Sequence, residues 1–258
     1  MERLPTSLPP LDLFRRRQND RPLISAHRGA LREMPENTMP SFARAHQLGA
    51  DLVEFDVQRT ADGQLVVLHD STVDRTTSGR GRLCDLTIDQ VRRLDAGGWF
   101  APEFAGASVP TLAEVLAWMR GRVYPILELK QEPGSGLPSL VEAVAAALEL
   151  AEMVDQTLVL SFDHPALLAM KERLPGIRTA ITYEGRLVDT VGAARAARAD
   201  AVWPSSAFLV QDDIGTVHRA GLALGCEGNT VAQALRLVEW GVDMVELNDL
   251  ASLVKSLS

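Results

Sequence analysis

The sequence predicts an α/β fold, a (β/α)8 TIM barrel with a small insertion after its second strand. Its 258 residues suit such a barrel formed as a single domain over 1–258. Short apolar segments typical of strands alternate with segments of helical periodicity, and eight such strands can be counted. Several of these strands end at ionisable residues, which is where barrels of this kind carry their functional side chains.

The first half of the chain supplies three of the expected barrel strands. They are Leu23–Ala26, Asp51–Gln58 and Tyr124–Lys130, and Leu65–His69 extends the second of them after an Asp62-Gly63 turn. Between them we expect a helix over Thr38–Leu48, with Asn37 or Thr38 near its N-cap. A second helix should begin at Thr111, where Glu114 completes a capping box.

Residues 71–108 interrupt this alternation. Five glycines punctuate the segment and its apolar residues are scattered, which indicates an insertion with at most a short helix around Thr87–Leu94. Trp99, Phe100 and Phe104 favour an ordered insertion, and we expect Trp99 and Phe100 to anchor it.

The second half of the chain returns to regular alternation. The expected strands are Thr157–Phe162, Ile177–Thr182, Asp200–Trp203, Leu222–Cys226 and Val242–Leu247. The expected helices are Leu137–Met153, His164–Leu174, Leu187–Ala196, one that ends at Ala220, Val231–Trp240 and Asp249–Leu257. A doubly wound open sheet is the alternative, but no glycine-rich phosphate motif of the GxGxxG or GxxxxGK[ST] type stands at a strand–helix junction.

Composition narrows the functional classes. The net charge of −8 and the pI near 5.2 oppose nucleic-acid binding, and Asp20 follows the one short basic run, Arg15-Arg16-Arg17. Two cysteines without CxxC spacing oppose a zinc-thiolate site and indicate a reducing compartment.

The prolines of residues 1–10 do not resemble a secretory signal, and no apolar stretch has the length of a membrane span. We expect a soluble cytoplasmic protein with a loose lead-in over residues 1–20, of which Leu11, Leu13 and Phe14 pack against the body. The oligomeric state stays open.

The ionisable residues at the strand ends should meet at one mouth of the barrel. His27 ends the first strand and His69 ends the extension of the second. Glu54 and Asp56 lie two residues apart and share a strand face, as do Glu128 and Lys130. Like charges buried together disfavour ionisation, and a bound divalent metal removes that penalty.

The ligand types set the expected chemistry. Oxygen ligands from Glu54, Asp56 and Glu128 favour Mg²⁺ or Ca²⁺, whereas histidine ligands would let zinc or manganese compete. We prefer His27 and His69 as acid and base, because histidine titrates near neutral pH. Arg28 and Lys130 add cationic groups for phosphate oxygens. These groups together indicate a metal-dependent phosphodiesterase.

The same residues resemble the glycerophosphodiester phosphodiesterase family over most of the chain, from Pro22 to about Leu250. The matching motifs are His27-Arg28-Gly29, Pro35-Glu36-Asn37-Thr38, Gly49-Ala50-Asp51-Leu52-Val53-Glu54-Phe55-Asp56-Val57, Thr60-Ala61-Asp62-Gly63, His69-Asp70, Val109-Pro110-Thr111-Leu112, Glu128-Leu129-Lys130 and Ser161-Phe162-Asp163. The resemblance implies a (β/α)8 barrel with an insertion after its second strand. It also implies metal ligation by Glu54, Asp56 and Glu128, acid–base roles for His27 and His69, and release of glycerol 3-phosphate and an alcohol from a small-molecule diester.

Two segments depart from the family pattern. Cys226-Glu227-Gly228-Asn229 stands where the family usually has Trp-Thr-Val-Asn, and Glu246-Leu247-Asn248-Asp249 lacks the usual Thr-Asp or Thr-Asn followed by proline. These departures bear on substrate choice, so a lysophospholipase D-like enzyme and a silent phosphodiester-binding barrel are the alternatives. Phe162 and Trp203 either line the leaving-group pocket or only pack. Glu36 and Asn37 either contact substrate or only tie the loop and cap the first helix.

Overall fold

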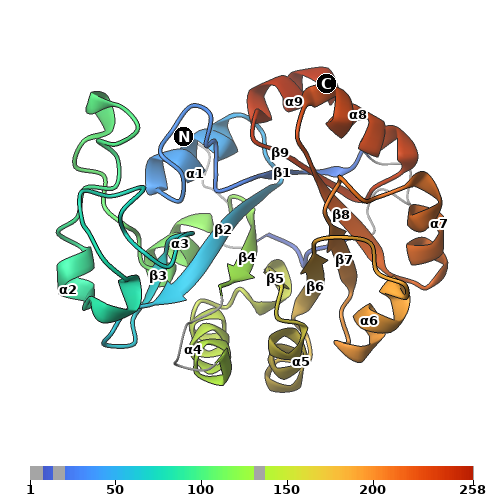
Figure 1. Ribbon diagram of the computed structural model, residues 1–258, viewed down its shortest axis with the longest axis horizontal. Helices are drawn as coiled ribbons and strands as arrows, with labels where there is room; N and C mark the ends of the chain where they lie inside the picture. Colours follow the sequence, from blue (N-terminus) through green and yellow to red (C-terminus); the bar gives the residue numbers. More distant parts are fainter. Residues whose placement is uncertain (1–7, 14–20, 131–136, 258) are drawn as a thin grey trace.

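A closed barrel of parallel strands forms the body of the protein (Figure 1). The structure, a computed structural model, describes residues 8–13, 21–130 and 137–257. Within these residues the barrel strands are β1 (Leu23–Ala26), β2 (Leu52–Arg59), β4 (Tyr124–Leu129), β5 (Leu158–Ser161), β6 (Arg178–Tyr183), β7 (Ala201–Pro204), β8 (Ala223–Gly228) and β9 (Met244–Leu247). Because β1 pairs with both β2 and β9, the sheet closes and the predicted (β/α)8 barrel is confirmed.

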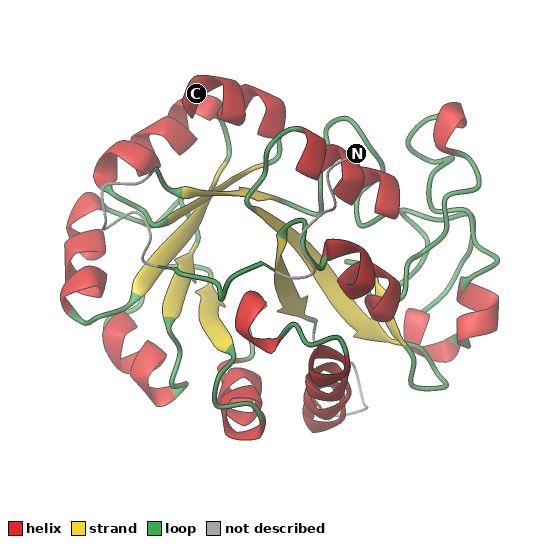
Figure 2. Ribbon diagram, turned by 180° about the vertical axis from the view of Figure 1, so that it is seen from behind, coloured by secondary structure: helices red, strands yellow, loops and turns green. Residues whose placement is uncertain are grey.

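Helices surround this barrel on its outer side (Figure 2). They are α1 (Met39–Gln47), α3 (Leu112–Met119), α4 (Leu137–Leu150), α5 (His164–Arg173), α6 (Thr190–Ala196), α7 (Gln211–Arg219), α8 (Val231–Trp240) and α9 (Leu250–Leu257). Thr38 caps α1, and the predicted capping box of Thr111 and Glu114 opens α3. The helix expected from Leu187 begins only at Thr190, because the Asp189 carboxylate accepts a hydrogen bond from Gly192 N at 2.7 Å and caps α6 there.

The insertion follows an antiparallel extension of the second strand. β3 (Leu65–Val67) pairs with the end of β2, and the predicted strand stops before His69. Beyond it, α2 (Ile88–Val91) is shorter than the predicted helix, and two 3₁₀ turns, η2 (Leu83–Asp85) and η3 (Pro102–Phe104), complete the regular structure. A separate apolar cluster holds the segment together: Val66, Leu68, Val73, Leu83, Val91, Ala96 and Val109. The rings of Trp99 and Phe100, also in the insertion, pack edge to face with their centroids 5.7 Å apart. The assignment of the whole chain to one domain stays a prediction.

Apolar side chains fill the barrel at the N-terminal end of its strands. Leu23 and Leu52, which begin β1 and β2, pack there with Leu11 and Leu13 of the lead-in. Leu11 N donates a hydrogen bond to Asp155 O in η4 (Val154–Gln156), just before β5. The lead-in thus closes one end of the barrel, as predicted for Leu11 and Leu13, and the C-terminal end is left for polar side chains. Phe14 and the basic run Arg15–Arg17 lie outside the described residues.

Candidate active site

Three carboxylates from neighbouring strands converge at the C-terminal end of the barrel. Glu54 and Asp56 lie two residues apart on β2, so both side chains point to the inner face of the barrel. The β2–β4 register places Asp56 beside Glu128. One oxygen of each lies within 4.8 Å of the others, so the group could hold a metal ion. Glu54 and Asp56 are buried, and Glu128 is partly buried. Sequence reasoning placed these three residues together, and the structure does the same.

Two cationic side chains pair with this group. Lys130 Nζ lies 2.7 Å from Glu128 Oε1 and 2.9 Å from Asp56 Oδ1. Arg28 Nε lies 3.5 Å from Asp56 Oδ2. Glu54 has neither partner; its Oε2 accepts a hydrogen bond from Arg28 N at 2.9 Å. Both cationic side chains therefore pair with Asp56, and neither forms an ion pair with Glu54.

The electrostatics of the three carboxylates indicate that one further cation fits among them. Burial, and then the charge of Asp56, raise the pKa of Glu54 well above its usual range. Burial also raises the pKa of Glu128, and Lys130 offsets this only in part. For Asp56 burial acts upward, but Lys130 and Arg28 outweigh it and lower the pKa. Asp56 Oδ1 is buried without a hydrogen-bond partner, although it lies at ion-pair distance from Lys130. A hard divalent cation would satisfy that oxygen and favour ionised Glu54 and Glu128.

His27 stands beside the carboxylate group with its ring held from one side. Its Nδ1 atom lies 2.7 Å from Asn248 Oδ1 and 3.3 Å from Glu227 Oε1, while Nε2 lies 4.0 Å from Glu54 Oε2. Burial lowers the pKa of His27, but the hydrogen bond with Glu227 and the charges of Glu246 and Glu54 outweigh it and raise the pKa to about 10. The surrounding carboxylates therefore favour the protonated form of the ring.

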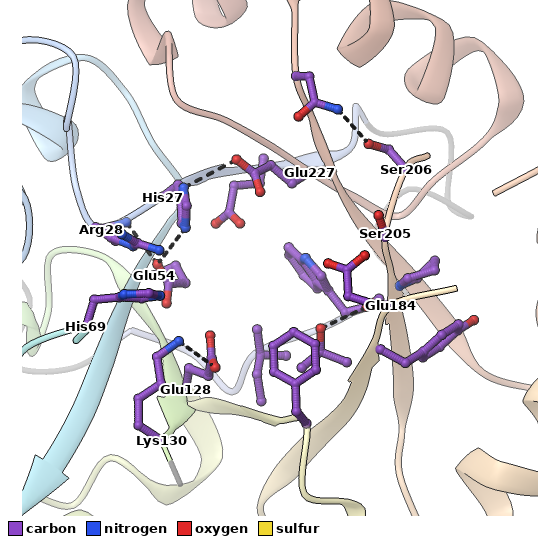
Figure 3. A pocket seen from close by; sticks show the side chains of 18 residues that line it. His27, Arg28, Glu54, His69, Glu128, Lys130, Glu184, Ser205, Ser206 and Glu227 are labelled. Carbon is purple, nitrogen blue, oxygen red and sulfur yellow. Dashed lines mark hydrogen bonds and ion pairs between the residues drawn. The ribbon is translucent and has the colours of Figure 1, made fainter. Parts of the chain in front are cut away.

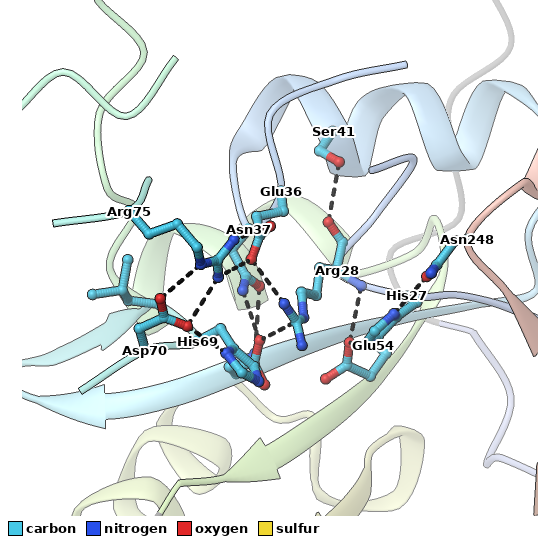
Figure 4. Close-up of polar contacts among 12 residues, drawn as sticks. His27, Arg28, Glu36, Asn37, Ser41, Glu54, His69, Asp70, Arg75 and Asn248 are labelled. Atoms are coloured by element: carbon cyan, nitrogen blue, oxygen red, sulfur yellow. Dashed lines mark hydrogen bonds and ion pairs between the residues drawn. The ribbon is translucent and has the colours of Figure 1, made fainter. Parts of the chain in front are cut away.

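His69 is positioned by the segment that follows β3 (Figure 4). Gln58 Nε2 donates hydrogen bonds to the carbonyl oxygens of residues 68, 69 and 70 at 2.7, 3.1 and 2.8 Å, which fixes the backbone there. The Nδ1 atom of His69 lies 2.7 Å from Asp70 Oδ1. Arg75 then joins Asp70 to Glu36 through hydrogen bonds of 2.7 to 2.9 Å. Sequence reasoning missed Gln58 and Arg75, because no motif marks them.

The loop after β1 connects the same groups from the other side. Asn37 Nδ2 donates to Asp56 Oδ2 at 2.7 Å, and Arg28 Nη1 donates to Glu36 Oε1 at 2.9 Å. Arg28 and Asn37 both adopt positive φ, of 50° and 57°. Gly29, at φ 83°, passes so close to α1 that a Cβ atom there would lie 2.3 Å from Ser41 Oγ. For Glu36 and Asn37 we weighed substrate contact against a role in holding the loop. Their contacts support the second role, because they hold the loop to Arg28, Asp56 and Arg75. Thr38, not Asn37, caps α1.

A cavity of about 300 Å³ opens above these groups (Figure 3). His27, Arg28, Glu54, His69, Glu128 and Lys130 line one side of it, and Asp56 lies beneath them. Phe162 and Trp203, predicted at the leaving-group end, both line it, as do Glu184, Ser205, Ser206 and Glu227. The structure therefore brings all nine predicted site residues to one end of the barrel. Glu184 was not singled out from the sequence, because it stands alone after a strand.

Comparisons with known proteins place the chain among phosphodiesterases. The model of the glycerophosphoryl diester phosphodiesterase family matches residues 27–251. A glycerophosphodiester phosphodiesterase of Caldanaerobacter subterraneus subsp. tengcongensis is 34% identical over 91% of this chain and 90% of its own length. The chain belongs to the glycerophosphoryl diester phosphodiesterase family.

Solved structures of the family have the same fold. A glycerophosphodiester phosphodiesterase of Agrobacterium tumefaciens aligns with a TM-score of 0.78 at 31% identity, over 90% of this chain and 98% of its own. A phosphodiesterase of Oleispira antarctica, solved in complex with the product sn-glycerol-3-phosphate, aligns with a TM-score of 0.87 at 26% identity, over 92% and 97%.

The positions where this member departs from the family pattern lie beside His27. Glu227 projects from β8 and Glu246 projects from β9. The Oε2 atom of Glu246 accepts a hydrogen bond of 2.7 Å from Ser25 Oγ. Burial, and then the charge of Glu227, raise the pKa of Glu246 to about 7 against the opposing charge of His27. One ligand atom each of His27, Glu227 and Glu246 also lie within 4.8 Å of one another, which makes them a second group that could hold a metal ion. None of the described helices has the length and hydropathy that crossing a membrane requires.

Proposed function

We propose that this protein hydrolyses glycerophosphodiesters to glycerol 3-phosphate and an alcohol, with a divalent metal held by Glu54, Asp56 and Glu128. The observation that carries the proposal is the convergence of these three carboxylates with two histidines and two cationic side chains at one end of the barrel, where all of them but Asp56 line one cavity. The product complex of the relative from Oleispira antarctica supports the same reaction.

Oxygen-only ligands support Mg²⁺ or Ca²⁺ as the metal. Such an ion would act as a Lewis acid toward the phosphate oxygens. Arg28 and Lys130 lie beside the carboxylates and would bind the same oxygens, because planar guanidinium and ammonium groups complement phosphate charge. Phe162 and Trp203 would contact the alcohol that leaves.

His27 and His69 would move the two protons that the reaction requires. One removes a proton from the nucleophile, and the other delivers a proton to the departing alkoxide oxygen. The nucleophile is either water or the neighbouring glycerol hydroxyl, and the second route passes through a cyclic phosphate. A substrate in which that hydroxyl is replaced by hydrogen separates the routes, because only the water route leaves it hydrolysable.

The decisive assay offers purified protein glycerophosphocholine, glycerophosphoethanolamine and glycerophosphoglycerol with Mg²⁺, Ca²⁺, Mn²⁺ or Zn²⁺, and measures glycerol 3-phosphate. We expect release with Mg²⁺ or Ca²⁺, and none after chelation. The variants H27N and H69N should each lower kcat by about 10²- to 10⁴-fold, the usual contribution of a general acid or base. Full activity in both variants, or no product from any diester, would refute the proposal. The second result would favour the silent phosphodiester-binding barrel.

A lysophospholipase D-like activity is a second candidate, favoured by exposed apolar residues near the mouth. Phe162, Val188 and Phe208 follow β5, β6 and β7, and their side chains are exposed. Such a rim would favour a substrate that carries an acyl chain. Rates on lysophosphatidylcholine and glycerophosphocholine, compared in the wild type and in V188S and F208S, test this. Preference for the lipid that falls in both variants supports the second candidate, and equal loss on both substrates opposes it.

The proposal also includes a cytoplasmic location for the protein. Cys84 and Cys226 are both free thiols, as expected in a reducing environment such as the cytoplasm. If a thiol-reactive reagent, added to a cell extract under denaturing conditions, labels both cysteines of this protein, the result would support this location.

A further inference from the structure

The cavity has two walls of different chemistry. Figure 3 shows Glu184 and Ser205 across the cavity from His69 and Lys130. The wall with Lys130 belongs to the carboxylate group. The opposite wall comes from the residues at and after the ends of β5, β6 and β7, and it takes no part in the proton transfers proposed above.

Aromatic side chains form part of this opposite wall. Phe162 follows β5, lines the cavity and is 55% exposed, so its ring is open to a ligand. Trp203 is only 6% exposed and its ring lies against Gly225, where even a Cβ atom would come within 2.1 Å of the ring. An exposed ring and a buried ring thus line the same cavity. Aromatic faces attract cations as well as apolar groups.

The charges on this wall are acidic. Glu184 is exposed, and none of the ion pairs among the described residues includes it. Glu227 stands between the two walls and already pairs with His27. Within the described residues, the arginine and lysine side chains that line the cavity, Arg28 and Lys130, both lie on the wall opposite Glu184. Glu184 therefore faces the cavity as a carboxylate that forms no ion pair with any cation in the described part of the chain.

We infer that this wall is a subsite for a leaving alcohol that carries a positive charge, with Glu184 as its specificity-determining residue. The inference rests on the proposed function, since it names which glycerophosphodiesters that site selects. A quaternary or primary ammonium group attached to the leaving oxygen would lie near the rings of Phe162 and Trp203 and near the Glu184 carboxylate. The phosphate would remain between Arg28 and Lys130.

A matched pair of substrates tests the charge alone. Glycerophosphocholine and its 3,3-dimethylbutyl analogue have leaving groups of the same shape, but the analogue has carbon in place of the quaternary nitrogen. We expect the wild type to prefer the cationic substrate in kcat/KM by about tenfold, the size expected for a cation at a partly exposed aromatic and acidic site. In E184Q the ratio of the two kcat/KM values should fall close to one.

Two controls make the result specific. E172Q removes the same charge from an exposed position on α5 that does not line the cavity, and it should keep the wild-type ratio. Thermal unfolding of each variant establishes that it is folded. F162A should also reduce the ratio, because it removes one of the rings.

The outcomes separate the two proposals. Equal kcat/KM values in the wild type, or an E184Q ratio equal to that of the wild type, overturns the subsite while leaving the hydrolysis itself in place. Failure to hydrolyse either substrate with any metal overturns the proposed function. In that case titration with choline, followed by tryptophan fluorescence, decides the subsite: binding that E184Q weakens supports it, and no binding to the wild type overturns it.

Discussion

The Nδ1 atom of His27 lies 2.7 Å from the Oδ1 atom of Asn248. An amide oxygen only accepts hydrogen bonds, so Nδ1 carries the proton and donates it. This contact turns the other ring nitrogen, Nε2, toward the carboxylate group, 4.0 Å from Glu54. The orientation of His27 therefore depends on a residue that directly follows the last barrel strand.

Replacing Asn248 should leave the His27 imidazole in place but make its orientation less well defined. We expect N248A to lower kcat by about tenfold, the lower end of the range seen when a group that orients a site histidine is lost. N248D keeps an acceptor oxygen and should retain more activity than N248A. Steady-state kinetics and thermal unfolding of both variants check this. Equal kcat in N248A and the wild type would mean that Glu227 alone orients His27.

Metal binding should depend on Asp56 and not on Glu227. Both residues belong to groups that could hold a metal ion, but they belong to different groups. A metal that binds only the folded state raises stability by about 2.7 kcal/mol at one hundred times its Kd. We expect Mg²⁺ or Ca²⁺ to raise the Tm of the wild type and of E227Q, and to leave the Tm of D56N unchanged. The reverse pattern would place the metal beside His27.

Glu246 should make the metal-free protein less stable as the pH rises. Its pKa is about 7 in the folded protein, against 4.5 for an unperturbed glutamate. The folded state therefore binds the proton more tightly than the unfolded state, and its free energy of unfolding decreases as the pH rises from about 4.5 to 7.

Urea unfolding in the presence of EDTA tests this sign. The free energy of unfolding of the wild type minus that of E246Q should fall between pH 5 and 7 by up to about 1.4 kcal/mol per pH unit, and then become constant. A difference that is independent of pH would show that Glu246 titrates normally.

Gly29 should tolerate alanine less well than another glycine of similar backbone conformation. Gly29 and Gly81 have φ of 83° and 102°, but a Cβ atom would meet Ser41 only at Gly29 and would meet nothing within 4 Å at Gly81. We expect G81A to cost about 1–2 kcal/mol through its backbone alone. G29A should cost at least about 1 kcal/mol more through overpacking, and should lower kcat because Arg28 N binds Glu54. Urea unfolding measures both, and equal costs would contradict the predicted contact.

Local periodicity was sufficient to predict the barrel and the residues on its inner face. Glu54 and Asp56 share a face because strand side chains alternate, so their meeting with Glu128 required only the order of the strands. The capping box at Thr111 likewise depends on neighbours in the sequence.

The contacts that orient the site are not local, and the sequence did not predict them. Asn248 and His27 are separated by 221 positions, and Arg75 and Glu36 by 39. Their pairing depends on how the barrel closes and on how the insertion, through Arg75, packs against the loop after β1. Glu184 was missed for a different reason: its place in the cavity depends on where β6 ends, and no local pattern marks that point.

Closure of the barrel also sets when the site can work during synthesis. β1, which His27 directly follows, pairs with β9 only after the whole of β9 has been translated, and the Ser25–Glu246 and His27–Asn248 contacts form with this pairing. A ribosome-bound chain that stops before Met244 already contains all three carboxylates, but it lacks Asn248, the hydrogen-bond partner of His27. Such a nascent chain would carry the three carboxylates without a correctly oriented histidine, so we expect the ability to cleave a diester to appear only when the final barrel strand has left the exit tunnel.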